Sequence, residues 1–426
     1  MKKFLKVLMI IGIVLVSLVV IRLVVTNITT LSLRAYIKSF DKVEYTEQIV
    51  PTKEEEGYYT LRSDDDLKIM VLTDIHIAGG FYSLKKDKKT VYELMTMVQK
   101  EKPDLVILDG DQTYPVPGPL FHGGGTFNNK MVAKNITLMF KQLGVYYTVV
   151  FGNHDTESFD FYSRKQIGEV YNGADHCIFE SNFDGYGVTN QCVLLKTNDG
   201  KIKKALMLID SNAYVDESFS ASVNWLYDTI HDEQVEWAKN TILELSEKEG
   251  HLVKSLFFFH IPVGEFETAY RELKANNWHD TADTKYVEGV WDEEISEDMG
   301  GRIWYGGCQY TDKDPNSNDK LFEELGPDGI GSMEGIFVGH DHTNNAVVIY
   351  KGVMLSYGYS LDNTAYADIA KSGLQRGSTV ITVKNDGTFT QVHKNAYLDY
   401  GVSSDKFFDV NTNDLYMPDI VSPPSK

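Results

Sequence analysis

Short apolar runs alternate with segments of helical spacing between residues 67 and 151. The runs Leu67–Thr73, Pro103–Leu108 and Val145–Phe151 predict buried strands. Between them, residues 88–100 and 132–143 repeat apolar side chains at helical spacing and predict two helices. This order of strands and helices is typical of βαβ units, in which helices cover a sheet.

The mixed pattern continues through the rest of the chain. We expect a helix at 233–248 and further strands at 193–196, 205–210, 256–259, 335–338, 346–350, 353–356 and 379–383. Residues 67–400 are therefore interpreted as one α/β domain. Within it, 263–332 is rich in Gly, Asn and Asp and is expected to form a long irregular insert. The final residues, 401–426, are expected to form a tail that adds little to the core.

The N-terminus has a different pattern. Three lysines precede an apolar run from Val7 to Ile21, which resumes after Arg22. This length approaches the about 20 residues that a helix needs to cross a bilayer. We predict a single-pass anchor in residues 1–25, with the N-terminus in the cytoplasm and the rest outside it, because the lysines precede the apolar run. Residues 26–66 are polar and are expected to form a linker or stalk with a short helix near residues 31–40.

A cleaved signal peptide is the alternative for residues 1–25, and it would make the protein secreted. The apolar run is long for a signal peptide, and Val24-Val25-Thr26 is a poor cleavage site. We therefore favour the membrane anchor.

Composition narrows the class of protein. Hydrophobic residues make up 42% and charged residues 24%, as in ordinary globular proteins. The net charge of −20 repels nucleic acid backbones, so binding to nucleic acid duplexes is not expected. Cys177, Cys192 and Cys308 form no CxxC pair, which argues against a thiolate zinc site. Cys177 and Cys192 are either a disulfide or two small buried residues.

Five segments place potential metal ligands directly after predicted strands. They are Asp74-Ile-His76, Gly110-Asp111, Gly152-Asn153-His154-Asp155, Phe259-His260 and Gly339-His340-Asp341-His342. In open α/β sheets, ligand sites form beyond the carboxyl ends of the strands, so these segments are expected to converge on one edge. Their carboxylates, imidazoles and single amide suit Mn, Fe or Zn.

In this order, the five motifs resemble the calcineurin-like metallophosphoesterase family. The segments GNHDTES, FFHIP and FVGHDH are most similar to its branch of purple-acid-phosphatase-related and Dcr2-type phosphatases. The resemblance covers roughly Leu67 to Ser356. It implies a four-layer sandwich of two mixed β-sheets flanked by helices, here preceded by the predicted transmembrane helix.

The resemblance also implies a role for each motif residue. Two divalent metal ions would have as ligands Asp74, His76 and His342 for the first, Asn153, His260 and His340 for the second, and Asp111 bridging both. His154 would protonate or stabilise the leaving oxygen, and Asp155 would orient His154. Hydroxide activated by the metals would attack a phosphate monoester or diester.

Two residues that lie close to the motif residues in the sequence, Tyr114 and Asp341, have open roles. Gly110–Tyr114 matches the segment in which purple acid phosphatases supply a tyrosinate to ferric iron, but His76 competes for the same metal. We expect His76 to bind the metal ion and Tyr114 to lie behind His76. If Tyr114 binds the metal instead, the ion would be ferric iron and the protein would be coloured. Asp341 lies between two ligands and either supports them or is a surface residue.

These motifs predict a metal-dependent hydrolase whose partner is a small phosphate ester or a membrane-proximal phosphodiester. The alternative is a catalytically silent domain of the same fold that serves as a scaffold or receptor at the membrane. Every expected ligand and His154 are present, which favours the enzyme.

Overall fold

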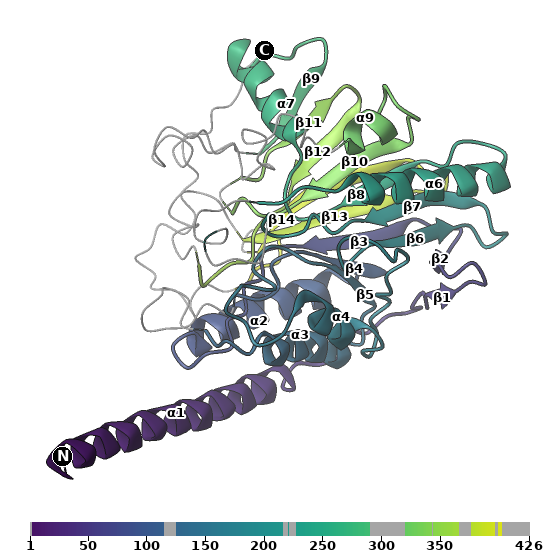
Figure 1. Ribbon diagram of the computed structural model, residues 1–426. Coiled ribbons are helices and arrows are strands. Elements are labelled where there is room, and N and C mark those ends of the chain that lie inside the picture. Colours follow the sequence, from purple (N-terminus) through teal and green to yellow (C-terminus); the bar gives the residue numbers. More distant parts are fainter. Residues whose placement is uncertain are drawn as a thin grey trace.

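Two β-sheets pack face to face, and helices cover both outer faces (Figure 1). The computed structural model describes residues 2–114, 125–215, 220, 227–289, 320–342, 344–365, 376–396 and 399–402. One sheet has the order β14 (Phe389–Asn395), β13 (Gly377–Val383), β3 (Leu67–Leu72), β4 (Leu105–Asp109) and β5 (Tyr147–Val150). Because β3, β4 and β5 are parallel and β13 is antiparallel to β3, this sheet is mixed.

The second sheet is also mixed. Its order is β1 (Thr52–Lys53), β2 (Tyr59–Arg62), β6 (Gln191–Lys196), β7 (Ile202–Leu208), β8 (Ser255–Phe258), β10 (Met333–Val338), β12 (Val353–Tyr357), β11 (Val347–Tyr350) and β9 (Thr284–Glu288). The central strands β7, β8, β10 and β12 are parallel. Their carboxyl ends therefore lie at one edge.

Alternating side chains build the layers. In β3, Leu67, Ile69 and Val71 belong to the core between the two sheets. Met70 and Leu72 point the other way, into the core beneath the helices. A strand buried on both faces has this near-continuous apolar sequence. The predicted four-layer α/β sandwich of two mixed sheets flanked by helices is confirmed.

The helices lie on the two outer faces. α1 (Lys2–Ile37), α2 (Leu84–Glu101), α3 (Asn129–Leu143) and α4 (Arg164–Tyr171) are on the side of the five-stranded sheet. α6 (Asp232–Glu249), α7 (Gly264–Ala275) and α9 (Leu321–Leu325) are on the side of the nine-stranded sheet. α3 begins where the Asn128 side chain accepts a hydrogen bond from Met131 N and ends at Gly144, which has φ 68°. These are ordinary start and stop signals.

The linker assigned to residues 26–66 needs correction. α1 continues to Ile37, and Leu33 and Ile37 are buried in the domain core. β1 and β2 follow within the same segment, and β2 pairs with β6. The segment is polar overall, but its few apolar residues are spaced to bury one face of a helix and one short strand.

The insert assigned to residues 263–332 is more regular than expected. It begins with α7 and β9 and ends with α9 and the loop before β10, while residues 290–319 lie outside the described ranges. Phe266, Ala269 and Leu273 give α7 one buried face. At the other end, Val402 is still buried, so the core extends past the predicted boundary at residue 400. Cys177 and Cys192 are free thiols.

α1 projects from the domain as a long helix (Figure 1). Among the described residues it is the helix long and apolar enough to cross a membrane. The part of α1 that projects from the domain exposes apolar side chains such as Val14 and Ile21. Nearer its end, Thr29, Thr30 and Leu33 are buried against the domain. The helix therefore consists of an exposed apolar part and a docked part.

Leu33→Ala should lower the free energy of unfolding by about 2–4 kcal/mol, because it leaves a cavity beneath the docked part of α1. Thermal unfolding of the full chain in detergent measures the loss. The matched control is Leu31→Ala on the exposed face, which should change stability by less than about 0.5 kcal/mol. Equal losses from the two variants would contradict the docking of α1.

Candidate metal centre

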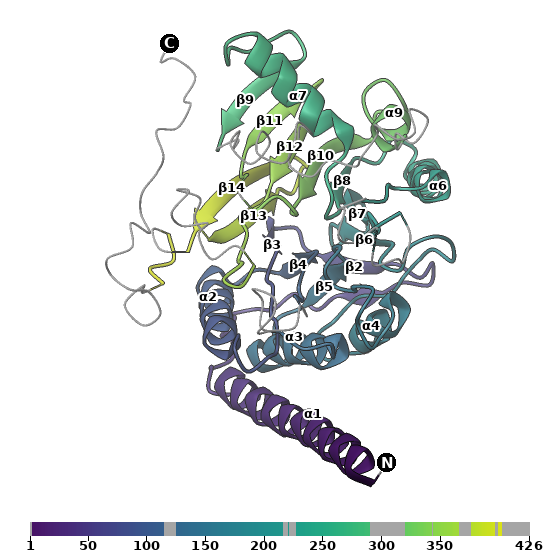
Figure 2. The same cartoon turned by 60° about the vertical axis from the view of Figure 1, so that its left-hand side comes forward.

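The predicted ligands converge at the carboxyl ends of five strands. Asp74 and His76 follow β3, Asp111 follows β4, and Asn153 follows β5. From the other sheet, His260 follows β8, and His340 and His342 follow β10. Figure 2 shows these strands side by side in the centre of the molecule. The site thus lies where the edges of the two sheets meet.

Six of these residues form two groups that share one member. One group is Asp74, His76, Asp111 and His342, and the other is Asp111, His260 and His340. Within each group the possible ligand atoms all lie within 4.8 Å of one another, and all six residues are buried. The groups divide the histidines as the family resemblance implied, with Asp111 between them.

Asn153 lies at the same edge with an amide oxygen available. Its side chain is buried, and Nδ2 donates to Tyr214 Oη at 3.3 Å. Among the described residues, its Oδ1 has no hydrogen-bond partner. A buried polar atom without a partner is unfavourable, and coordination to a metal ion would satisfy it. The donor set therefore fits divalent cations, although binding by each residue remains a prediction.

Carboxylates and imidazoles are in close contact within the groups. Asp111 Oδ2 lies 3.2 Å from His76 Nε2 and 3.1 Å from His260 Nε2. Burial disfavours the imidazolium, but the negative charge of Asp111 outweighs it and raises the pKa of His260 to about 9. Burial likewise opposes ionisation of Asp111, yet His260 holds the pKa of that carboxyl well below its usual range. A metal ion bound here would displace protons from these histidines, so its affinity would fall as pH falls.

Backbone strain accompanies the ligands. Asp74, His76 and Asp111 have φ of 51°, 51° and 52°, and His340 has 72°. Non-glycine residues rarely adopt these left-handed conformations, and where they do they cluster at functional sites. Gly152 shows how closely the chain packs, because a Cβ atom there would lie 2.1 Å from Asp111 Oδ1.

Asp155 fastens two ligand loops together instead of orienting His154. Its Oδ2 accepts hydrogen bonds from the backbone N–H groups of Asp111 at 3.0 Å and Gly152 at 2.8 Å. Its Oδ1 accepts from Thr113 N at 3.0 Å. The Asp155 side chain points toward these buried N–H groups, which would otherwise lack a hydrogen-bond acceptor. The role predicted for Asp155 is therefore corrected.

Glu157 is the carboxylate that contacts His154. The His154 Nδ1–H donates to Glu157 Oε1 at 2.6 Å, and Tyr214 Oη donates to the same oxygen at 3.3 Å. Glu157 stands three residues after His154, so it can reach back across one turn of chain. The sequence offered no signal that distinguishes Glu157 from Asp155.

Arg164 supports the loop that carries Asn153 and His154. Its guanidinium donates to the carbonyl oxygens of Gly152 at 2.9 Å and Phe151 at 3.2 Å. The same group pairs with the buried Asp210 through Nε at 3.0 Å. This charge pair, with its carboxylate fully buried and its guanidinium mostly so, fixes the loop after β5.

Asp362 was not predicted, yet it contacts two of the histidines. Its carboxylate oxygens lie 3.4 Å from His76 Nδ1 and 3.3 Å from His342 Nδ1. Asp362 is buried and also accepts from the backbone N–H of Thr364 at 2.6 Å. A carboxylate on the Nδ1 side fixes an imidazole with Nε2 free to bind metal. Asp362 lies outside every strand-end motif, so nothing in its sequence context singled it out.

The two residues with open roles also lie near the site. The Tyr114 ring stacks on His76, with centroids 4.9 Å apart and an angle of 18° between the rings. Asp341 Oδ2 accepts from Asn344 Nδ2 at 2.7 Å. Tyr114 is therefore adjacent to a predicted ligand, and the Asp341 carboxylate is hydrogen-bonded within the loop after β10.

The fold and these two ligand groups define the class of protein. Residues 67–344 match the family of calcineurin-like phosphoesterases, and the chain belongs to that family. The resemblance recognised in the five motifs is confirmed.

Individual relatives include plant and yeast phosphatases. The chain is 25% identical to "Probable inactive purple acid phosphatase 29" of Arabidopsis thaliana over 75% of this chain and 77% of the relative. It is 24% identical to "Phosphatase DCR2" of Saccharomyces cerevisiae over 68% of this chain and 46% of that protein. A solved dimetal phosphatase from Danio rerio has a TM-score of 0.46 and 10% identity, covering 78% of this chain and 96% of that chain.

Asp362→Asn should weaken metal binding about 10–100-fold, since an amide can accept from only one imidazole and turns its NH₂ toward the other. Competition between the protein and a chelator for manganese measures the affinity. Asp328→Asn removes an exposed carboxylate that pairs with Lys351 and is the control. Unchanged affinity in Asp362→Asn would show that the contact with His76 and His342 does not support the site.

Proposed function

We propose that this protein hydrolyses phosphate esters with the help of two divalent metal ions, which are Mn, Fe or Zn. The observation that carries the proposal is the pair of buried ligand groups that share Asp111. We assign Asp74, His76 and His342 to one ion, and Asn153, His260 and His340 to the other. Family membership supports a phosphoesterase but leaves the choice between a monoester and a diester to experiment.

When bound, the two ions would polarise the phosphoryl group and lower the pKa of an attacking water. The chain's own residues prepare the site for this chemistry. Asp362 holds the imidazoles of His76 and His342 with their Nε2 atoms directed away from it. Asp155 and Arg164 hold the loops after β4 and β5 in place. We expect His76 to bind metal and Tyr114 to pack behind it.

His154 is proposed as the acid that protonates the leaving oxygen. Because its Nδ1–H donates to Glu157, Nε2 is left for the substrate. Tyr214 joins this pair to the site, since it donates to Glu157 and accepts from Asn153 Nδ2. His154 is partly exposed, with 22% of its side chain accessible, as a group that meets substrate should be.

The second candidate is a catalytically silent scaffold or receptor. It is favoured by the word "inactive" in the names of three Arabidopsis thaliana relatives. The complete ligand groups and the paired His154 of this chain support the enzyme instead. We also propose that α1 anchors the chain as a single-pass helix with its N-terminus in the cytoplasm. The continuous, docked helix supports an anchor over a cleaved signal.

Removal of metal should abolish hydrolysis of p-nitrophenyl phosphate and bis-p-nitrophenyl phosphate, and manganese should restore it. The ratio of the two rates identifies the protein as a phosphatase or a phosphodiesterase. Asn153→Ala should reduce the rate to background, which controls for contaminating enzymes. A stoichiometrically loaded protein that turns over neither compound would favour the scaffold.

His154→Ala should slow hydrolysis of an alkyl phosphate ester about 10²–10⁴-fold, because its alkoxide leaving group needs a proton. The p-nitrophenyl ester should lose much less, since p-nitrophenolate leaves without protonation. Glu157→Gln should show a weaker form of the same selectivity. Equal losses for both substrates in steady-state assays would rule out His154 as the acid.

A further inference from the structure

The direction of α1 relative to the domain is set by its contacts with α3. Thr30 Oγ1 contacts Met131 Sδ at 2.8 Å, and Arg34 Nε donates to Asn135 Oδ1 at 2.9 Å. Farther along, Val43 N donates to Leu143 O at 2.9 Å. Later residues of the N-terminal segment thus contact later residues of α3, so α1 and α3 are parallel.

α2 gives the same direction independently. Lys88 Nζ lies 5.5 Å from the centre of the Tyr36 ring, and Gln99 Nε2 donates to Asp41 O at 2.7 Å. α2 and α3 connect the parallel strands β3, β4 and β5, so each helix runs opposite to the strands. Both helices therefore begin at the edge where the metal centre lies.

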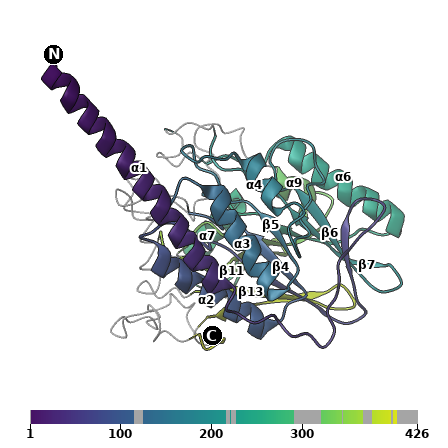
Figure 3. The same ribbon diagram turned by 90° about the horizontal axis from the view of Figure 1, so that it is seen from below.

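The exposed apolar part of α1 consequently projects beyond the edge that carries the metal centre. Figure 3 shows α1 running alongside α2 and α3 and continuing past them. Ile28 is 61% exposed, whereas the next residue, Thr29, is buried against the domain. From Val25 to Thr29 the helix rises only about 6 Å. A bilayer around the apolar part would lie directly against this edge.

Exposed aromatic side chains lie on the same edge. Phe81 and Tyr82 stand between β3 and α2 and are 58% and 65% exposed. Phe161 stands between β5 and α4, is 64% exposed, and binds through its N–H to Phe127 O, just before α3. Aromatic rings exposed beside an apolar helix are typical of the membrane interface.

We propose that the metal centre faces the bilayer surface and that its substrate is a phosphate ester carried on a membrane lipid. Phe81, Tyr82 and Phe161 contact the interface and hold this edge of the domain against it. The assignment of a lipid substrate rests on the proposed function and on α1 spanning a membrane. The orientation does not depend on turnover.

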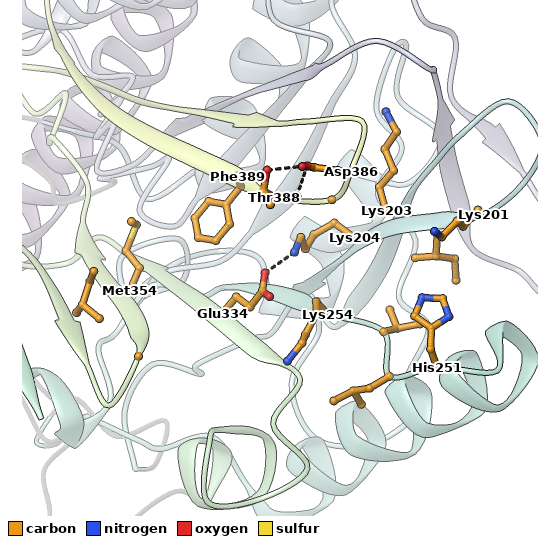
Figure 4. A pocket seen from close by; sticks show the side chains of 16 residues that line it. Lys201, Lys203, Lys204, His251, Lys254, Glu334, Met354, Asp386, Thr388 and Phe389 are labelled. Atoms are coloured by element: carbon orange, nitrogen blue, oxygen red, sulfur yellow. Dashed lines mark hydrogen bonds and ion pairs between the residues drawn. The ribbon is translucent and has the colours of Figure 1, made fainter.

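The edge of the domain opposite the metal centre serves as the control position for a test of orientation. A cavity of about 640 Å³ lies there, at the amino ends of β7, β8 and β10 (Figure 4). Lys204 and Glu334 form an ion pair within it, and Lys201 lies at its rim just before β7. If the metal centre faces the bilayer, this edge faces water.

Fluorescence quenching in phosphatidylcholine nanodiscs tests the orientation. The full chain would carry an environment-sensitive label at Tyr82→Cys, Phe161→Cys or Lys201→Cys, with Cys177, Cys192 and Cys308 replaced by Ala. Spin-labelled lipid should quench the labels at 82 and 161 and spare the label at 201. Quenching at 201 that equals or exceeds the other two overturns the orientation, whether or not the protein is an enzyme.

Turnover in the same nanodiscs tests the substrate class. Phosphatidic acid should be hydrolysed at least about tenfold faster than soluble glycerol 3-phosphate at equal bulk concentration, because anchoring raises the effective concentration. If the enzyme prefers diesters, phosphatidylglycerol and glycerophosphoglycerol replace this pair. Replacing Phe81, Tyr82 and Phe161 together by Ser should lower the lipid rate and leave p-nitrophenyl ester hydrolysis unchanged.

The outcomes separate the two proposals. Equal rates on lipid and soluble esters, with p-nitrophenyl ester hydrolysis intact, overturn the lipid substrate and leave the proposed function standing. If no ester is hydrolysed by metal-loaded protein, the proposed function and the lipid substrate both fail, and the quenching result still decides the orientation.

Discussion

The candidate site depends on one carboxylate that two ligand groups share. Asp111 Oδ2 lies within 3.2 Å of His76 Nε2 and 3.1 Å of His260 Nε2, and these histidines come from different sheets. For Asp111 to occupy this position, β4 must end between β3 and β5 while β8 and β10 end opposite it. The parallel order of those strands is therefore the constraint that makes a two-metal site geometrically possible.

Holding several buried charges together requires further structure around the ligands. Asp155 accepts three backbone N–H groups and joins the loops after β4 and β5, and Asp362 joins the histidines after β3 and β10. Four of the predicted ligands have left-handed backbone conformations that cost free energy. These contacts hold the candidate ligands in place within the folded protein, which would suit catalysis that relies on preorganised charge.

The sequence placed the candidate ligands correctly because each comes just after an apolar strand, so the strand pattern alone puts Asp74, Asp111 and His260 at one edge. Glu157 was missed because Asp155, in the same GNHDTES segment, is an equally plausible partner for His154. Asp362 was missed because it reaches its histidines from a loop without a motif. α7 was missed because its apolar spacing is short and lies in a polar stretch. β9 was missed because an edge strand needs few apolar residues. Contacts between loops that are distant in the sequence can be identified only from the structure, whereas residues at the ends of strands can be predicted from the sequence.

The central claim is that Asp111 lies between two metal ions. Anomalous diffraction from crystals of the manganese-loaded protein tests it most directly. The account predicts two peaks on either side of the Asp111 carboxylate, about 3.5–4 Å apart, with Asn153 beside the peak at His260 and His340. A single peak, or two peaks that do not share Asp111, would contradict it.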